Sequence, residues 1–476
     1  MIMQENIEKI CAVVLKQIAP GKKDRERILA LARKLEAKVV SACKALGVEA
    51  EVQVAGSVAK DTWLSEEPEI DVFMRVSLKI PRESLGKVCL RVARKATRGS
   101  KQVERFAEHP FLEAFVDGVR VNIVPCYDVK LGDWHSATDR TPYHTNYIRK
   151  HLDAGLRNEV RLLKRFMKGI GVYGAEIKIG GFSGYLCELL VLHYGGFASV
   201  LKAFACHRRH IVVDIENHYK SRESELALLF KEPLVIVDPV DKGRNVASAV
   251  QAEKLHNFVA AARAFLNKPS KRFFYPPEIV ALPVEELKKT LVERGSKIVT
   301  VIFGKVDAVP DILWGQLYRS QRFLRKLVEL NDFKILRDVV WSDENTLGTF
   351  IFELEDCCIS SVKKHLGPPL DKERECENFL AKYVGKPCTV VGPYVEDGRW
   401  VVQIHRKYTD VCVLFRERLK GGGRNAGVAE KVSLILHKGF KILVNEEMED
   451  VYVKNREFAR FVTEFLSGKP RWLEPA

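Results

Sequence analysis

An acidic, apolar, acidic triplet, Glu69-Ile70-Asp71, places the tightest constraint on the fold of this chain. Side chains alternate between the two faces of an extended strand, so Glu69 and Asp71 point to the same face. The apolar side chains between and after them then point into a core: Ile70, Val72 and Met74. The triplet therefore predicts a strand that carries two carboxylates on one face, and paired carboxylate oxygens suit Mg²⁺.

The residues before this strand predict a place for phosphate groups. Residues 48–54 alternate as a half-buried strand, and Gly56-Ser57 then offers a turn with free backbone N–H groups. Thr62-Trp63-Leu64 is expected to close a short helix whose N-terminus faces the same pocket. Alone, each motif is commonly just a solvated strand or a turn. Their order and spacing favour a site for a nucleoside triphosphate bridged to a metal ion.

Several motifs together resemble a known family. The run from Gly56 to Leu64, followed by residues 69–73, resembles the signature of the polymerase-beta-type nucleotidyltransferase superfamily. Five later segments resemble one member family closely, the archaeal-type (class I) CCA-adding tRNA nucleotidyltransferases. These segments are residues 161–164, 171–176, 181–190, 238–241 and 244–247. The resemblance covers at least residues 50 to 250.

The resemblance implies an activity that the residues alone do not specify. Similar enzymes add C, C and A to the 3′ end of tRNA from CTP and ATP without a nucleic-acid template. They use a two-metal site, for which Mg²⁺ is the expected cofactor. The implied partners are tRNA, CTP and ATP, with no membrane, and similar proteins are often homodimers.

One position departs from the family pattern. Residues 119–127 form a good alternating strand, and the family has a third metal-binding aspartate where this chain has Asn122. An amide oxygen can touch Mg²⁺, but it carries no charge and cannot act as a base. Asp117 is expected in the turn before the strand and is a poor substitute. Two explanations stay open, an inactivating Asp-to-Asn change or a natural variant that works weakly or not at all, and we favour the first.

The resemblance also implies the residues that hold the nucleotide. Lys164 and Tyr173 match residues that contact the triphosphate, and Arg244 is expected to read the incoming base through its planar donor fork. Without the family, Lys164 would be an ordinary surface lysine and Arg244 a salt-bridged structural arginine. The full set of expected site residues is Glu69, Asp71 and Asn122 for metal and catalysis, and Gly56, Ser57, Lys60, Thr141, His144, Lys164, Tyr173 and Arg244 for nucleotide.

Two other functions remain compatible with these motifs. Poly(A) polymerases and oligoadenylate synthetases share the head and something like the second domain, and incorporation of CTP separates them from CCA addition. A non-catalytic tRNA-binding relative is the alternative from a different class, and Asn122 is its best support.

Composition agrees with a nucleic-acid partner. The 476 residues carry 77 Lys and Arg against 62 Asp and Glu, a net charge of +15, which favours a polyanion over an acidic protein. No run of about 18 apolar residues predicts a membrane span, and the first 16 residues lack the pattern of a signal peptide. A cytoplasmic location is therefore expected. The 11 cysteines include no metal-like CxxC pair.

We expect an α/β multidomain fold. A mixed-sheet nucleotidyltransferase head occupies 1–150, with amphipathic helices over 24–46 and near 82–96, and a mostly helical domain follows over 151–267. Residues 268–271 look like a linker to an α+β body at 268–370, built as strand, helix, strand. An arm at 371–439 carries a glycine-rich basic loop at 420–424, which is either a contact to tRNA backbone or a solvated loop. Residues 440–476 are expected to return to the body.

Overall fold

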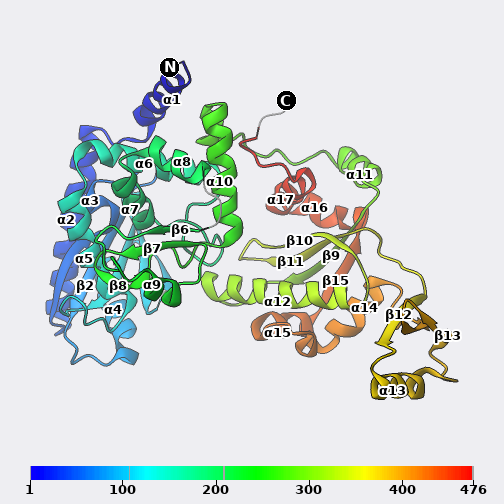
Figure 1. Ribbon diagram of the computed structural model, residues 1–476. Coiled ribbons are helices and arrows are strands. Elements are labelled where there is room, and N and C mark those ends of the chain that lie inside the picture. Colours follow the sequence, from blue (N-terminus) through cyan, green and yellow to red (C-terminus); the bar gives the residue numbers. More distant parts are fainter. Residues whose placement is uncertain (1, 107, 207–209, 474–476) are drawn as a thin grey trace. The chain divides into compact units, whose positions relative to one another are not determined.

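The computed structural model describes residues 2–106, 108–206 and 210–473 and divides the chain into two compact units (Figure 1). Unit 1 is Met1–Glu278 together with Lys469–Ala476, and unit 2 is Ile279–Gly468. Both units combine helices with sheets, so the expected multidomain α/β fold is confirmed. The finer boundaries near residues 150, 370 and 439 stay predictions.

Unit 1 begins with two helices and then builds a five-stranded sheet in the order β1-β2-β5-β4-β3. Its elements are α1 (Ile2–Ile18), α2 (Lys22–Ala45), β1 (Ala50–Ala55), α3 (Gly56–Lys60), β2 (Glu69–Val76), α4 (Arg82–Ala96), β3 (Lys101–Phe106), β4 (Pro110–Val116) and β5 (Val119–Tyr127). The central pair, β2 and β5, is parallel, and every other neighbouring pair is antiparallel. This pairing sets Asp71 opposite Asn122.

One face of the sheet is covered by α2 and α4. Ile70, Val72 and Met74 are 0% exposed and pack among the buried side chains of these two helices, as the strand alternation predicted. The helices bury one stripe each, because their apolar residues recur at three- and four-residue steps. Glu69 and Asp71 therefore lie on the opposite face of the sheet.

The rest of unit 1 is built mostly from helices and also contains a small sheet. Its helices are α5 (Thr141–His151), α6 (Ala154–Gly169), α7 (Gly184–Tyr194), α8 (Phe197–Ala205), α9 (Glu223–Leu229) and α10 (Ala252–Asn267). The strands β6 (Ile211–Val213), β7 (Leu234–Asp238) and β8 (Asp241–Asn245) form a small additional sheet. The sequence missed it because β7 is buried along its whole length, and a short, continuously apolar run does not distinguish a strand from a helix.

No single described helix is long and apolar enough to cross a membrane. The bent pair α7 and α8 would qualify together by length and composition alone, but both helices supply side chains to the core of unit 1.

The linker predicted at Lys268–Lys271 does not separate the two units, because these residues lie within unit 1. Helix α10 ends at Asn267, a short 3₁₀ turn follows at Lys271–Phe273, and unit 1 continues to Glu278. Phe273 and Phe274 are buried in the core, where Phe273 stacks on Phe166 and on Trp472. These two buried aromatic side chains anchor the segment to the core. The polar composition of residues 268–271 alone therefore did not identify a linker.

Unit 2 contains a four-stranded antiparallel sheet in the order β10-β11-β9-β15. The predicted strand, helix, strand is present as β9 (Lys297–Gly304), α12 (Pro310–Leu330) and β11 (Leu347–Leu354). Strands β10 (Ile335–Ser342) and β15 (Phe440–Val444) complete the sheet, so the chain after residue 439 does rejoin it. It leaves again at Lys469, from which the described residues belong to unit 1.

The remainder of unit 2 comprises further helices and a smaller sheet. The order of the smaller sheet is β12-β14-β13. The elements are α11 (Val284–Glu293), β12 (Val362–Pro369), α13 (Glu373–Tyr383), β13 (Thr389–Glu396), β14 (Arg399–His405), α14 (Val411–Leu419), α15 (Glu430–Lys438), α16 (Glu449–Lys454) and α17 (Arg456–Ser467). The glycine-rich loop at 420–424 is not purely solvated, because Gly422 is buried against Ser433.

The close fit around Gly169 gives a test of the core of unit 1. A Cβ at Gly169 would lie 2.1 Å from the backbone oxygen of Phe273 and 2.6 Å from that of Phe274. We expect Gly169→Ala to lower the free energy of unfolding by about 1–3 kcal/mol through overpacking. Gly155→Ala in the same helix is the control, since its Cβ would come no closer than 3.3 Å to Asp153. Urea unfolding measures both variants, and equal stability would contradict the described packing.

Candidate active site

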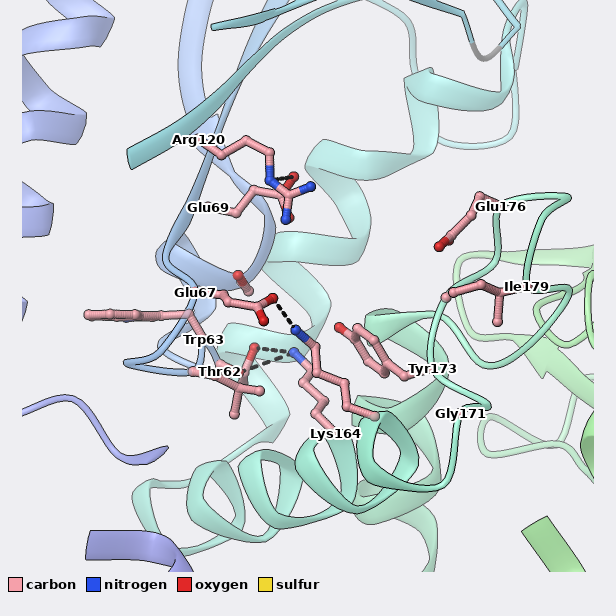
Figure 2. Close-up of a pocket in the computed structure, with 14 residues that line it drawn as sticks. Thr62, Trp63, Glu67, Glu69, Arg120, Lys164, Gly171, Tyr173, Glu176 and Ile179 are labelled. Carbon is pink, nitrogen blue, oxygen red and sulfur yellow. Dashed lines mark hydrogen bonds and ion pairs between the residues drawn. The ribbon is translucent and has the colours of Figure 1, made fainter. Parts of the chain in front are cut away.

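A cavity of about 540 Å³ opens beside β2 in unit 1. Glu69 and Arg120 lie on one side of it, and Lys164 and Tyr173 lie on the other (Figure 2). Ser57 also lines the cavity. The strand that carries the acids, the short helix after β1 and the helix α6 therefore meet at one place, although Ser57 and Lys164 lie 107 positions apart in the sequence.

The two carboxylates converge on a single atom. The Nδ2 of Asn122 donates hydrogen bonds to Glu69 Oε1 at 2.7 Å and to Asp71 Oδ1 at 2.9 Å. The parallel register of β2 and β5 makes this possible, since it sets Asp71 beside Asn122. Arg120 Nε lies 3.5 Å from Glu69 Oε1 and adds a positive charge at the edge. The carboxylates are thus close enough together to need a bridging donor or a cation.

Burial and the repulsion between the two carboxylates change the pKa of Asp71. Burial raises the pKa of Asp71 most, the neighbouring Glu69 carboxylate raises it further, and Asn122, Lys60 and Arg120 lower it, with a net value of about 7. Gly56 borders this carboxylate closely, because a Cβ at that position would lie 2.0 Å from Asp71 Oδ2. Gly56 also has a φ of +67°, which side chains other than glycine rarely adopt. Glycine at position 56 therefore fits both the turn and the close approach.

Two lysines are buried against one glutamate behind the cavity. Glu188 is 0% exposed and accepts from Lys60 Nζ at 2.5 Å, from Thr62 Oγ1 at 2.5 Å and from Lys164 Nζ at 3.3 Å. Burial lowers the pKa of Lys164, whereas the charge of Glu188 raises it, and the net shift is downward. Burial raises the pKa of Glu188, but the two lysines outweigh it and the net pKa is lowered. The cluster holds one carboxylate between two ammonium groups.

The short helix before this cluster ends earlier than predicted. Helix α3 stops at Lys60, so Thr62-Trp63-Leu64 follows the helix and does not close it. Arg161, itself 1% exposed, holds this segment by donating to the backbone oxygens of Asp61 and Trp63. The hydroxyl of Thr62 consequently points inward to Glu188.

A second polar cluster forms around Asp238 at the end of β7. Asp238 is buried and accepts from His144 Nε2 at 2.8 Å, from Arg244 Nη1 at 2.7 Å and from the Tyr185 hydroxyl at 3.2 Å. Burial raises the pKa of Asp238, but His144 and Arg244 outweigh it and lower the pKa to about 2. Burial is also the main reason that the pKa of His144 is lowered. Because a carboxylate only accepts, Nε2 of His144 carries the hydrogen.

The structure brings most of the predicted nucleotide residues into these connected groups. Ser57, Lys164 and Tyr173 line the cavity with Glu69, and His144 and Arg244 share Asp238. Lys60 lies between the groups, with its Nζ 5.7 Å from the centre of the Tyr185 ring. Thr141 begins α5, and its backbone oxygen accepts from Thr145. Its side chain is not placed against either cluster by any described contact.

Sequence reasoning assigned no role to Glu188 or Asp238. Glu188 had a signal, since it is the one charged residue in the otherwise apolar run Gly184–Val191. A lone acid at that position is buried only when it is paired. Asp238 ends a continuously apolar, buried strand, where a carboxylate also needs a partner. Their partners, however, lie up to 128 residues away and could not be read from the sequence.

Comparison with known proteins defines the class. Residues 158–275 match the family model "tRNA nucleotidyltransferase, second domain", and residues 294–445 match "CCA-adding enzyme, C-terminal domain". The chain is thus a tRNA nucleotidyltransferase, and both its units carry a matched domain.

Relatives that match most of the chain identify the family more specifically. The "CCA-adding enzyme" of Methanosarcina acetivorans is 34% identical over 96% of this chain and 98% of that protein. The protein of that name from Halobacterium salinarum is 36% identical over 97% of each chain, and that from Pyrobaculum neutrophilum is 37% identical over 87% of this chain and 94% of that protein. This chain belongs to the CCA-adding enzyme family. A solved structure of the Cid1 poly(U) polymerase aligns with 58% of this chain and 99% of that chain, at 17% identity and a TM-score of 0.43.

Removal of the Glu188 carboxylate tests the buried lysine cluster. We expect Glu188→Ala to lower the free energy of unfolding by about 3–5 kcal/mol, because two buried cations lose their counterion. Glu67→Gln is the control, since it removes the half-exposed partner of Lys168 and is expected to cost less than about 1 kcal/mol. Urea unfolding at neutral pH compares the two. A Glu188→Ala variant no less stable than Glu67→Gln would contradict the cluster.

The same cluster sets the direction of a pH effect. The pKa of Glu188 is lower in the folded chain than its ordinary value, so the ionised carboxylate stabilises the fold above that ordinary value. This contribution is lost as the pH falls through the lowered pKa. The stability difference between the wild type and Glu188→Gln is therefore expected to shrink in acid.

Proposed function

We propose that this chain is built to add C, C and A to the 3′ end of tRNA from CTP and ATP, with Asn122 limiting the chemical step. The observation that carries the proposal is the convergence of Glu69 and Asp71 on one atom beside a lysine-lined cavity. Membership of the CCA-adding enzyme family supports the substrate class. The cytoplasmic location and a homodimer stay predictions from the sequence.

The acid pair fits a divalent cation. Two carboxylate oxygens lie within 2.9 Å of the same nitrogen, so they converge on a point that a small cation can take. Rotation of the Asn122 amide would turn its oxygen to the same point, and an all-oxygen set suits Mg²⁺. Glu69, Asp71 and Asn122 would hold the ion. When bound, such an ion lowers the pKa of the attacking 3′-hydroxyl and neutralises charge on the triphosphate.

The remaining residues serve the nucleotide. The backbone N–H groups at Gly56 and Ser57 and the ammonium of Lys164 bind triphosphate oxygens, and Tyr173 closes the cavity beside Lys164 (Figure 2). Lys60 contributes positive charge from behind, since it is buried at Glu188. Thr141 and His144 are proposed as phosphate-side contacts.

Base selection is assigned to Arg244. Its side chain is 36% exposed, and one guanidinium nitrogen donates to the buried Asp238. The other donors of the planar fork stay available to donate hydrogen bonds to acceptor atoms on a cytosine or adenine edge. Selection between C and A also needs the tRNA 3′ end as part of the pocket.

The non-catalytic tRNA-binding relative remains the second candidate because of Asn122. Within the described residues, no group of three His, Cys, Asp or Glu side chains is arranged to hold a metal ion. The amide of Asn122 instead donates to both carboxylates, and it carries no charge that would help to hold a cation. A chain so arranged could bind tRNA and nucleotide without turnover.

Restoring a third carboxylate separates the two candidates. We expect Asn122→Asp to raise the rate of C and A addition to a tRNA lacking its 3′ CCA by about 100-fold or more, since a metal ion supplies several kcal/mol of charge stabilisation. Without metal, three adjacent carboxylates should lower the melting temperature, and millimolar Mg²⁺ should restore it. Asn146→Asp on the exposed surface of α5 is the control. Binding of tRNA and CTP without turnover in Asn122→Asp would favour the non-catalytic relative.

Selection of the base is tested in the activated background. In Asn122→Asp, the further change Arg244→Ala is expected to reduce the preference for CTP and ATP over UTP and GTP by at least about tenfold, because bidentate donors are lost. Arg222→Ala is the control, since Arg222 pairs with Glu225 on the surface. Single-nucleotide incorporation assays with each triphosphate measure the preference. Unchanged selectivity would remove Arg244 from this role.

A further inference from the structure

The basic excess of the chain is concentrated on two neighbouring helices. Together α2 and α4 contain thirteen Lys and Arg against four Asp and Glu, a net charge of +9. The other 437 residues carry 64 basic and 58 acidic side chains, which is close to balance. The net charge of +15 is therefore mainly a property of this helical layer and not of the surface in general.

Ten of these thirteen cations are exposed and make no ion pair with an acid in the described part of the chain. Five of the ten are Lys34 and Lys38 on α2 and Lys87, Arg91 and Lys95 on α4. Other cations of the layer are paired, such as Arg82 with Glu108 and Arg94 with Glu104. The five are thus available to an external anion.

The spacing of these cations destabilises the helices that carry them. Lys87, Arg91 and Lys95 follow each other at four-residue steps, and Lys34 and Lys38 do the same. Like charges at this spacing lie about 6 Å apart along the axis and destabilise a helix by about 0.2–0.5 kcal/mol for each pair. Packing does not require them, because the buried stripes of both helices are apolar. Because folding does not favour these rows of cations, we infer that they bind an anionic partner.

This layer lies away from the candidate active site. Helices α2 and α4 cover the sheet face that Ile70 and Val72 enter, whereas Glu69 and Asp71 lie on the other face. A nucleotide or a tRNA 3′ end in the cavity would not reach the outward side of α2 and α4. The basic layer is a separate surface of unit 1.

We propose that the exposed face of α2 and α4 binds the phosphate backbone of RNA, at a surface distinct from the site that takes the 3′ end. Regular rows of lysine and arginine suit a phosphodiester chain, which gives affinity through counterion release without reading sequence. RNA fits better than an anionic membrane, because Leu29 is the single large apolar side chain among the described residues of these helices that is strongly exposed. A helix that lies on a bilayer needs an apolar face.

Binding of a blunt-ended RNA duplex, without CTP or ATP, tests the proposal independently of catalysis. Fluorescence anisotropy over 50–200 mM salt compares the full chain with two variants, Lys87→Gln/Arg91→Gln/Lys95→Gln and Lys34→Gln/Lys38→Gln. The control is Lys16→Gln/Lys202→Gln/Lys220→Gln, which removes three exposed lysines elsewhere in unit 1. We expect the α4 triple variant to bind about tenfold more weakly at the lowest salt, with a salt slope smaller by about 2 to 3. The control should stay within about twofold of the wild type.

The position of the RNA-binding surface is measured on the chain without substitutions. Acetylation of lysines, read by mass spectrometry with and without the duplex, should show protection of Lys34, Lys38, Lys87 and Lys95 and none of Lys16, Lys202 or Lys220. Equal weakening by the test and control variants, or absence of this protection, would overturn the proposal. So would loss of binding to phosphatidylserine vesicles in the test variants with RNA binding unchanged, since this would assign the face to a membrane. Circular dichroism confirms that each variant is folded.

Discussion

The parallel pairing of β2 with β5 is the constraint on which the site depends. It sets Asp71 opposite Asn122 and allows one amide nitrogen to reach both Glu69 and Asp71. A register slip of one residue would turn the carboxylates into the apolar layer of α2 and α4 and expose Ile70 and Val72 instead. The burial of those two side chains therefore fixes the orientation of the acids as firmly as any polar contact does.

Away from this pair, buried acids hold the cationic side chains of the pocket in place. Glu188 holds Lys60 and Lys164, and Asp238 holds His144 and Arg244. A buried cation without a counterion is costly, but a cation held by an acid is already desolvated and oriented. The first cluster keeps one unit of excess positive charge for phosphate, because two ammonium groups face one carboxylate. Asp238 similarly limits the orientation of the Arg244 fork.

Local pattern in the sequence was enough to predict the strand of the acids, the helix near 82–96 and the strand 119–127, since each follows from alternation or helical spacing alone. It failed where the decisive contact is long-range. The burial of Phe273 and Phe274 depends on Phe166 and Trp472, and the inward turn of Thr62 depends on Glu188. The face shared by Glu69 and Asp71 could be predicted, but the acids that hold the surrounding cations could not be matched to their partners.

The two charged surfaces of unit 1 act separately. Exposed charges interact weakly beyond the Debye length, which is about 8 Å at physiological ionic strength. A helix with its side chains is about 10–12 Å across, so the outer side chains of α2 and α4 lie at least that far from the surface on which these helices pack. The cations of α2 and α4 therefore give little help to a nucleotide beside Glu69, on the far side of the sheet. Their effect requires direct contact with an anion, so this basic layer is understood as a binding surface and not as a field that supports catalysis.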